Sequence, residues 1–394
     1  MGGLGAVDPA RDSPARLTLV EVTTATGFEA LRGDWNRLAE RLVPRSPFHS
    51  WEWNWAWWRN LAPRSQLHIL VFGLDAEVVG IAQLHERGLP AARSIAPLGW
   101  GALTEDLELL FLEQHRRALL GGTLSWIRER RWLLVRLPQL RGHEISALQL
   151  DSRLADVREV VFETLELPPT WEALLGRLSR SMRGNTRYYP RLLERHGHAL
   201  GFEIVEAPED LTAALAQVSE LHRERAQVRT RVPHKDYLKA PSRRQLLRDV
   251  GALDGLDWRL RVGRLRVDGE LVAAQMWLEQ GGTIHLLYSG YKPAWAAYSV
   301  AMITTSEIIQ SGIRRGFRRV EFLRGEELFK SRWQTSKRTR FDVILTPVPA
   351  LVGRLIRRFR RLRRVARRLR SSVVDVLRTG SVRVRLERAG SPPE

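Results

Sequence analysis

The segment from Thr283 to Trp333 contains two strand patterns joined by a helix pattern. TIHLLYSGY (283–291) is typical of a strand, KPAWAAYSVAMITTSEIIQSGI (292–313) of a loop that leads into a helix, and RRVEFLRGEELFKSRW (318–333) of a second strand followed by a loop. Apolar residues recur at the period expected of each element. A strand–helix–strand unit of this kind predicts an α/β fold, in which the helix covers one face of a sheet.

Comparable elements precede this unit in both halves of the chain. The second half has a long helix pattern at 211–230 and two strand patterns around Asp268-Gly269, a dipeptide that favours tight hairpins. In the first half, a helix pattern at 28–42 precedes strand patterns at 66–72 and 78–85. A short strand pattern at 106–111 then precedes a helix pattern at 115–130. The predicted fold class is α/β (α+β), with tandem similar domains, each a mixed central sheet flanked by helices.

Five tryptophans occur in WEWNWAWW, residues 51–58. Trp51, Trp55 and Trp58 would share one face of a helix, with the other two on its flank. This spacing predicts a buried helix over 48–61. Its aromatic side chains then either fill the core or form a wall of a substrate pocket.

Composition excludes several classes of protein. The chain has 394 residues, 44% hydrophobic and 27% charged, which is ordinary for globular proteins and argues against disorder. It has no cysteine, which excludes disulfides, a thiol nucleophile and metal sites built on thiolates. Because the chain also lacks HExxH, DxD and P-loop motifs, we expect no metal site.

The basic charge is concentrated near the C-terminus. The net charge of +19 favours acidic partners, and ten arginines with no acid lie between residues 354 and 370. Apolar residues recur there at helical spacing, which predicts a basic amphipathic helix over 351–370. We expect this helix to lie on an anionic membrane surface. The alternative is a helix packed on the second domain with its charges in solvent.

The N-terminal residues lack the basic and apolar regions of a signal peptide, and no run of about 18 apolar residues occurs. These features predict a cytoplasmic protein, peripheral on the inner face of the membrane if the basic helix anchors it. The predicted domains are a flexible leader (1–16), an N-terminal domain (17–165), a C-terminal domain (166–348) and an Arg-rich helix and tail (349–394).

Three motifs resemble the CelD/FemAB-type acyltransferases of the GNAT superfamily. They are YSGY at 288–291, Trp-x2-Tyr-Ser at 295–299 and Gly-Glu-Glu-x2-Lys-x2-Trp at 325–333. The resemblance is clearest over about residues 170–340 and extends more weakly to the segment 47–53 and the basic tail. It implies a protein with two GNAT domains that transfers an acyl group in bacterial envelope or exopolysaccharide pathways.

The resemblance places the donor site at the N-terminus of the helix in this unit. In a GNAT fold, free N–H groups there hold the pyrophosphate of acyl-CoA (acetyl-CoA), a co-substrate and not a permanently bound cofactor. The corresponding residues are Tyr298, Ser299, Val300, Ala301 and Met302. The family usually has Pro-Gly where this chain has Val300-Ala301, and loss of the glycine hinders close approach of a phosphate. The alternative is that Ser299 only caps a core helix.

The resemblance also points to Glu326, Glu327 and Lys330 as catalytic residues. Acyl transfer to an amine or hydroxyl needs a base for the acceptor proton and a cation or N–H group for the oxyanion. A carboxylate beside Lys330 in a strand-to-helix loop would supply both. The alternative is structural: an acid that caps the next helix and an ion pair that closes the turn.

Basic residues at helical spacing are candidates for substrate binding. Arg183, Arg187 and Arg191 would bind a phosphate or an acidic sugar, and they resemble a basic segment of the family. A solvated helix face explains them equally well. Trp333, which ends the third motif, completes this part of the predicted substrate site.

His222 and Arg225 fit a family-like His-x2-Arg pattern and are further substrate-binding candidates, as is Tyr288. A structural histidine is the alternative for His222. His285 lies in the same strand pattern as Tyr288. Strand alternation predicts that these two side chains point to opposite faces and do not line one pocket.

The predicted function is acyl transfer, most simply N-acetylation, from acyl-CoA or acyl carrier protein to an amine or hydroxyl of an envelope, polysaccharide or small-molecule precursor. Without a cysteine or a serine in a nucleophile elbow, direct attack in a ternary complex is expected. One alternative is FemAB-like aminoacyl transfer from tRNA, although the helical hairpin of its tRNA-binding members is missing between 202 and 282. The other is a non-catalytic protein that binds a polyanion. The charge does not favour nucleic acid, because most of it lies outside the predicted domains.

Overall fold

The computed structural model describes residues 17–89, 92–101, 103–147, 155–228, 234–253, 256–325 and 328–346. The predicted leader, the predicted basic helix at 351–370, and Glu326 and Glu327 lie outside these residues. Within them, every helix is too short or too polar to cross a membrane.

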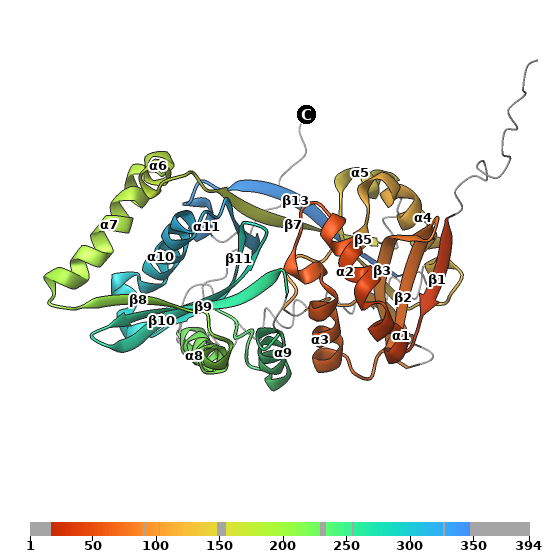
Figure 1. The fold of residues 1–394 in the computed structure, drawn as a ribbon, viewed down its shortest axis with the longest axis horizontal. Coiled ribbons are helices and arrows are strands. Elements are labelled where there is room, and N and C mark those ends of the chain that lie inside the picture. The colour runs from red at the N-terminus through yellow and green to blue at the C-terminus, as the bar shows by residue number, and fades with distance from the viewer. Residues whose placement is uncertain are drawn as a thin grey trace, which may run out of the picture.

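The first half of the chain alternates short helices with strands (Figure 1). Its elements are β1 (Thr18–Val22), α1 (Ala25–Ala30), α2 (Arg32–Arg41), η2 (Pro47–His49), α3 (Trp51–Leu61), β2 (Gln66–Leu74), β3 (Glu77–Arg87), β4 (Ser94–Pro97), β5 (Leu110–Phe111), η4 (Glu113–His115), α4 (Arg116–Arg128), β6 (Leu134–Leu140) and α5 (Gly142–Ala147).

The second half follows a similar order, with longer elements. They are β7 (Ala155–Glu166), α6 (Trp171–Arg177), α7 (Arg180–Arg195), β8 (Leu200–Val205), α8 (Pro208–Gln227), α9 (Pro241–Gly251), β9 (Trp258–Val267), β10 (Glu270–Gln280), β11 (Thr283–Tyr291), η5 (Pro293–Tyr298), α10 (Val300–Arg314), β12 (Arg319–Arg324), α11 (Leu328–Ser331) and β13 (Ser336–Leu345).

The strands of both halves form one continuous mixed sheet. Its order is β1-β2-β3-β4-β6-β13-β7-β12-β11-β10-β9-β8, with β5 paired to β3. β4 and β6 are parallel, as are β11 and β12, and each parallel pair is joined through a helix (α4 or α10). This large mixed sheet with flanking helices confirms the predicted fold class.

Two strands lie at the junction of the halves. β13, near the C-terminal end of the described chain, pairs with β6 of the first half and with β7. β7 in turn pairs with β12 of the second half. Each half of the sheet is therefore completed by strands from distant parts of the sequence. The predicted domain boundary at 165/166 falls at the end of β7 and stays a prediction.

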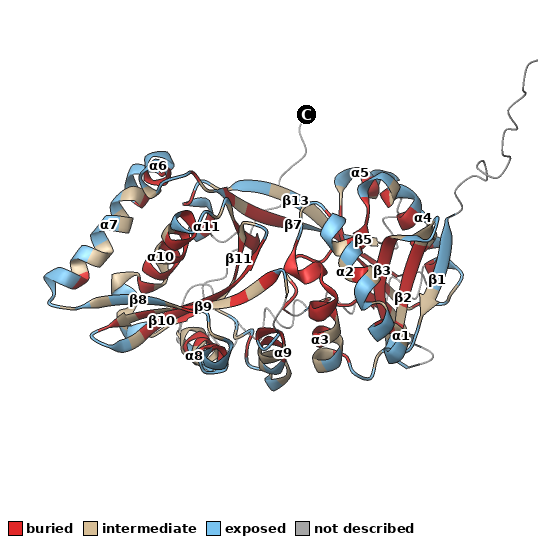
Figure 2. Cartoon of the chain, in the orientation of Figure 1, coloured by how far each residue is buried: buried red, intermediate tan, exposed pale blue. Residues whose placement is uncertain are grey.

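Helices cover both faces of the sheet in the second half. Figure 1 shows α8 and α9 on one side of β8–β11, and α10 with α7 on the other. Gly290 of β11 lies against the backbone of α8, which allows that helix to approach the strand closely. α9 also meets α3 of the first half, where Asn60 Nδ2 donates to Asp249 Oδ2 at 2.7 Å. The buried residues run without a break from the first half into this layer (Figure 2).

The tryptophan-rich segment forms the buried helix that its spacing predicts. Ser50 caps α3 by accepting a hydrogen bond from the N–H of Trp53. The Trp53 and Trp57 side chains are almost fully buried, and Trp53 Nε1 donates to Thr104 Oγ1 at 2.8 Å. These rings fill the core between α3 and the neighbouring loop, so the core interpretation holds for them.

Two expected elements differ from the observed ones. The helix predicted over 28–42 is split into α1 and α2 at Leu31, whose N–H already bonds within the first helix. The strand predicted over 106–111 is reduced to Leu110–Phe111. Asp106 and Glu108 instead turn toward arginines of β13, because buried carboxylates need a cationic partner.

Candidate active site

The parallel strands β11 and β12 pair over only three residues and then diverge. The pairs are Thr283 with Arg319, Ile284 with Val320, and His285 with Glu321. β11 continues to Tyr291, and β12 turns toward β7. Beyond His285, the edge of β11 that faces β12 has no strand partner within the described residues. A strand edge of this kind can pair with an extended ligand that enters between the strands, although the Ser289 carbonyl already accepts from His222.

A β-bulge in β11 changes the direction of its side chains at the point of divergence. Gln275 of β10 pairs with Ser289, but Trp277 pairs with Leu286, so β11 has one extra residue between these pairs. Leu287 and Tyr288 both pack against the cluster that includes Phe48, and the Phe48 ring lies 6.5 Å from that of His285. The expectation that His285 and Tyr288 face opposite sides is wrong, because a bulge interrupts strict alternation.

Tyr288 links the two halves of the molecule. Its hydroxyl donates a hydrogen bond to Glu105 Oε1 at 2.8 Å, from β11 to the loop before β5. Burial raises the pKa of the Tyr288 phenol well above its ordinary value of 10, and the neighbouring Glu105 carboxyl raises it further. The phenol therefore stays protonated at neutral pH and remains a hydrogen-bond donor.

Glu321 is the buried carboxyl nearest to the divergence. Thr164 Oγ1 of β7 donates to Glu321 Oε2 at 2.9 Å. Burial raises the pKa of Glu321 above 4.5, although the Thr164 hydrogen bond and the Arg338 charge oppose the shift. A carboxyl with a raised pKa is a suitable base for a proton released by an attacking amine or hydroxyl.

Two buried histidines belong to this region, and one of them, His285, pairs with Glu321 across the strands. His285 and His49 are 2% and 4% exposed, and neither ring nitrogen of either residue has a hydrogen-bond partner within the described part of the chain. Burial lowers the pKa of His285 to about 3, and the His49 charge contributes. His285 is therefore neutral at physiological pH. A buried polar group without a partner is costly, so these rings point to a ligand or water that completes their bonds.

The rest of this polar region comes from the C-terminal strand β13 and from the loop before β5. Arg338 of β13 lies 3.9 Å from Asp106 and 3.8 Å from Glu108, and Arg340 Nε donates to Glu108 Oε1 at 3.1 Å. The Arg116 and His49 charges and the Arg340 contact hold the pKa of Glu108 below 4.5 in spite of its burial. The buried polar region thus combines groups from β11, β12, β13 and the first half.

Three predicted site residues meet on the α8 side of β11. His222 Nδ1 donates to the Ser289 carbonyl at 2.8 Å, and its Nε2 accepts from the Tyr237 N–H at 3.2 Å. Burial lowers the pKa of His222, consistent with this neutral tautomer. Arg225 Nη1 donates to Ser289 Oγ at 3.2 Å, and the Tyr288 ring lies 5.7 Å from that of His222. These contacts show how His222 and Arg225 hold the bulged end of β11.

The predicted donor residues form the start of α10. Ser299 precedes the helix in a left-handed conformation (φ 50°), and its carbonyl accepts from the N–H groups of Met302 and Ile303. Val300 is buried, and the Tyr298 hydroxyl lies 2.8 Å from His196 Nδ1 of α7. The helix N-terminus lies where β11 ends, because α10 returns along the sheet to β12.

The other predicted residues lie further from the divergence. Lys330 is buried in α11, and its Nζ donates to the carbonyls of Arg324 (2.6 Å) and Gly325 (3.3 Å). It thereby ties α11 to the end of β12. Trp333 is buried in the core beneath α10. The predicted arginines Arg183, Arg187 and Arg191 lie on α7, the last two exposed to solvent.

Sequence reasoning missed His49, Glu105, Glu321 and Arg338. The signal for Glu321 was present, because it is a charged residue inside the otherwise apolar strand VEFL. The other three come from the first half and from β13. These three residues come close to the site because strands that are far apart in the sequence pair with one another. No local sequence pattern predicts such pairing.

The family comparison covers the part of the chain that carries this unit. Residues 180–331 match an acetyltransferase (GNAT) domain. The matched range runs from α7 to α11 and includes the divergence of β11 and β12. It supports an acyltransferase enzyme. Among proteins of curated function, none matches the sequence.

Several solved structures are similar to this chain. FemX is 11% identical over 82% of this chain and 96% of its own, with a TM-score of 0.51. A tandem GNAT protein from the clavulanic acid biosynthesis pathway is 13% identical over 85% and 100%, with a TM-score of 0.48. The C-terminal domain of a putative lysylphosphatidylglycerol synthetase from Agrobacterium fabrum is 12% identical over 84% and 95%, also with a TM-score of 0.48.

Proposed function

We propose that this protein transfers an acyl group from an acyl-CoA or acyl carrier protein thioester to an amine or hydroxyl of an envelope, polysaccharide or related small-molecule precursor, as the CelD-like resemblance suggests. The observation that carries the proposal is the divergence of β11 and β12 immediately after the His285–Glu321 pair. Buried polar side chains from both halves surround it. The GNAT domain match covers the same strands.

The donor lies between the two strands in this proposal. The unpaired edge of β11 supplies N–H and carbonyl groups to the extended arm of the thioester. The positive end of α10, at Ser299–Met302, faces the donor phosphates. Tyr298 is held by His196 and fixes the approach to that helix. The acyl carbonyl then lies near the bulge, within reach of Tyr288.

The acid–base chemistry follows from the two buried oxygen groups. The acceptor nitrogen or oxygen attacks the thioester carbonyl, and its proton passes to the Glu321 carboxylate. The new C–N or C–O bond forms, the C–S bond breaks, and the thiolate leaves. The Tyr288 hydroxyl, kept protonated by burial, exchanges its hydrogen bond to Glu105 for one to the developing oxyanion. Glu321 finally releases its proton, which restores the thiol.

The residues predicted from the resemblance take supporting places in this scheme. Lys330 ties α11 to the end of β12. Glu326 and Glu327 remain candidates for a second acid–base pair. His222 and Arg225 position the bulge through Ser289. The exposed arginines of α7 bind acidic groups of a substrate. Residues 351–370 attach the protein, as a cytoplasmic enzyme, to an anionic membrane surface.

A thiol-release assay tests the proposal. The chain has no cysteine, so a thiol reagent detects only the CoA released from acetyl-CoA in the presence of a panel of amines and alcohols. We expect release in the wild type and a drop of about 10² in kcat/KM for Glu321→Gln. Glu159→Gln, an exposed glutamate on β7, is the matched control and should keep full activity.

The same assay separates the alternatives. If no thiol is released and calorimetry detects no binding of acetyl-CoA, transfer from acyl-CoA is excluded. Release only from an acyl carrier thioester would select that donor. Transfer from a charged tRNA, with no reaction of either thioester, would support aminoacyl transfer of the FemAB type instead.

A further inference from the structure

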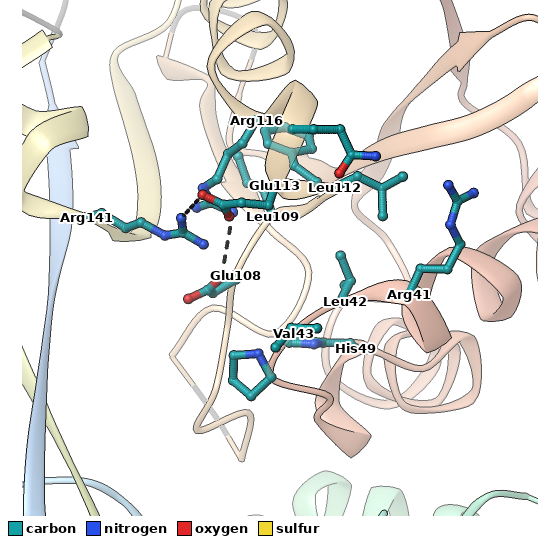
Figure 3. A pocket seen from close by; sticks show the side chains of 13 residues that line it. Arg41, Leu42, Val43, His49, Glu108, Leu109, Leu112, Glu113, Arg116 and Arg141 are labelled. Carbon is teal, nitrogen blue, oxygen red and sulfur yellow. Dashed lines mark hydrogen bonds and ion pairs between the residues drawn. The ribbon is translucent and has the colours of Figure 1, made fainter.

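The first half contains a pocket of about 460 Å³, which shares His49 and Glu108 with the buried polar region at the divergence of β11 and β12. It lies between the end of α2, the turn η2 and the segment that leads into α4 (Figure 3). A cavity of this size holds a ligand as large as a monosaccharide or a small glycoside. None of the predicted site residues lines it.

His49 is the feature that marks this pocket as a binding site. The ring lines the pocket and is 96% buried, and neither nitrogen has a hydrogen-bond partner in the described ranges of the chain. Arg141, on the opposite wall, has a buried Nε–H that is likewise unpaired there. An imidazole ring has at least one N–H donor, and its neutral form also has an acceptor nitrogen. A group that both donates and accepts, such as a hydroxyl, satisfies it.

The charges that line the pocket already neutralise one another. Figure 3 shows Arg116 paired with Glu108 and Arg141 paired with Glu113 on one wall. Arg116 also binds Glu144, and Arg41 on the other side binds Glu77. A charged ligand would have to break one of these pairs or remain without a counterion, so the pocket favours an uncharged ligand.

The remaining wall is apolar. It lies opposite the planar guanidinium and carboxylate groups and is formed by Leu42, Val43, Pro44, Leu109 and Leu112. Planar polar groups pair with neighbouring hydroxyls, whereas the apolar wall accepts the C–H face of a ring. We infer that this pocket binds a neutral, hydroxyl-rich molecule through His49 and that this molecule is the acyl acceptor.

The second part of the inference rests on the proposed function. His49 lines the pocket, and the ring of its neighbour Phe48 in η2 lies 6.5 Å from that of His285, so η2 lies between the pocket and the divergence of the strands. A hydroxyl that reaches past His49 attacks the thioester: the C–O bond forms, the C–S bond breaks, and the hydroxyl proton moves to a carboxylate. The acceptor is then an alcohol and not an ammonium group.

Ligand-observed NMR tests the binding without relying on activity. The probes are methyl β-glucoside, which is neutral, glucosamine, which carries an ammonium at pH 6.5, and glucuronate, which is anionic. We expect the neutral sugar to bind at least about tenfold more tightly than either charged one. Equal or tighter binding of a charged sugar, or no binding of the neutral one, would overturn the assignment.

Variants place the binding in this pocket. Gln114→Trp, at an exposed residue of the rim, should block entry and weaken glucoside binding at least about tenfold, whereas Gln114→Ala should not. Gln245→Trp on α9 is the matched bulky control. His49→Phe keeps an aromatic ring but removes both ring nitrogens, and it should weaken glucoside binding to a similar extent. Unaltered binding in Gln114→Trp would show that the sugar binds elsewhere and refute the inference.

The acceptor role has its own readout. With acetyl-CoA present, the glucoside should accelerate thiol release in the wild type and in Gln245→Trp, but not in Gln114→Trp. Sugar binding without any turnover of acetyl-CoA would contradict the proposed function and leave the pocket assignment intact. Acceleration by glucosamine but not by the glucoside would overturn the choice of a hydroxyl acceptor.

Discussion

Ionisation of Glu321 lowers the stability of the folded protein, whereas the proposed reaction requires the ionised carboxylate. Burial raises its pKa above 4.5, so the folded chain binds a proton at this carboxyl more tightly than the unfolded chain does. Its contribution to stability is therefore present below pH 4.5 and is lost as the pH rises through the folded pKa. We expect Glu321→Gln to melt at the same temperature as the wild type or higher at pH 7. A lower melting temperature at pH 7 would show that the ionised form is stabilised.

The pH dependence of the reaction follows from the same carboxyl. The base must be ionised, so wild-type kcat/KM should fall as the pH decreases through the raised pKa of Glu321. In Glu321→Gln the low residual rate should show no acidic limb there. Rate profiles between pH 4.5 and 8, with Glu159→Gln as control, measure this. An unchanged acidic limb in Glu321→Gln would assign the base to another residue, with Glu326 and Glu327 the next to test.

His285 and Tyr288 show what residue patterns can and cannot predict. Both were recognisable as polar residues in an apolar strand, and Tyr288 lies in the site as predicted by the motif. Their relative orientation was predicted from alternation, and it failed because one extra residue in β11 opposes Met276. A bulge depends on the pairing of two strands, so the sequence of β11 alone does not contain it.

The close contact between α8 and β11 holds the bulged end of β11 in the site. A Cβ at Gly290 would lie 2.2 Å from the His222 nitrogen and 2.3 Å from the Leu221 carbonyl carbon, both backbone atoms of α8. Gly290→Ala must therefore displace the helix, at an expected cost of about 3 kcal/mol of unfolding free energy. Urea denaturation measures it. Gly201→Ala on β8, with no atom within 4 Å, is the control; equal midpoints for the two variants would contradict the account.

Because β7 pairs with both β12 and β13, we expect the second half of the chain to need β7 in order to fold. A fragment that begins at residue 166 loses β7, which separates β12 from β13 in the sheet. We expect it to be unfolded or aggregated, because β12 and β13 would both expose a bare strand edge. A fragment that begins at residue 155 keeps both pairs and should show more native circular dichroism. Equal folding of the two fragments would show that β7 is dispensable to the second half.

Most elements were predictable because they carry strong periodic patterns. The hairpins β2–β3 and β9–β10 and the helices α8 and α10 lie close to their predicted ranges. β13 was not recognised, since SKRTRFDVIL alternates basic residues with few apolar ones. Arg338 and Arg340 form ion pairs with Glu108 of the first half. The sequence of this strand therefore reflects ion pairs at the junction of the two halves and not the apolar pattern of a core strand.

At the scale of the whole molecule, buried histidines make the fold sensitive to acid. Burial lowers the pKa of both His85 and His285 to about 3. Between pH 6.5 and about 3 the unfolded chain binds protons that the folded chain does not, so stability falls as the pH falls. We expect a loss of the order of a few kcal/mol from pH 7 to pH 4.5 in urea denaturation. His85→Gln should reduce this dependence, and a pH-independent midpoint would contradict it.

The basic tail gives a second prediction at this scale. Ten arginines between residues 354 and 370 are each worth about 1 kcal/mol near an anionic surface at low salt. Deletion of residues 351–394 should abolish salt-sensitive binding to anionic liposomes and leave acetyl-CoA binding unchanged, as sedimentation with vesicles measures. If the full-length protein does not bind such vesicles at low salt, the membrane proposal is excluded.

The central claim is that the acyl donor binds where β11 and β12 diverge, against the start of α10. Hydrogen–deuterium exchange with and without saturating acetyl-CoA tests it most directly, because backbone amides that pair with the ligand are protected. The account predicts slower exchange confined to residues 286–303, with β2 and β3 of the first half unchanged. Protection restricted to the first half, or none at 286–303 when calorimetry shows that acetyl-CoA is bound, would contradict it.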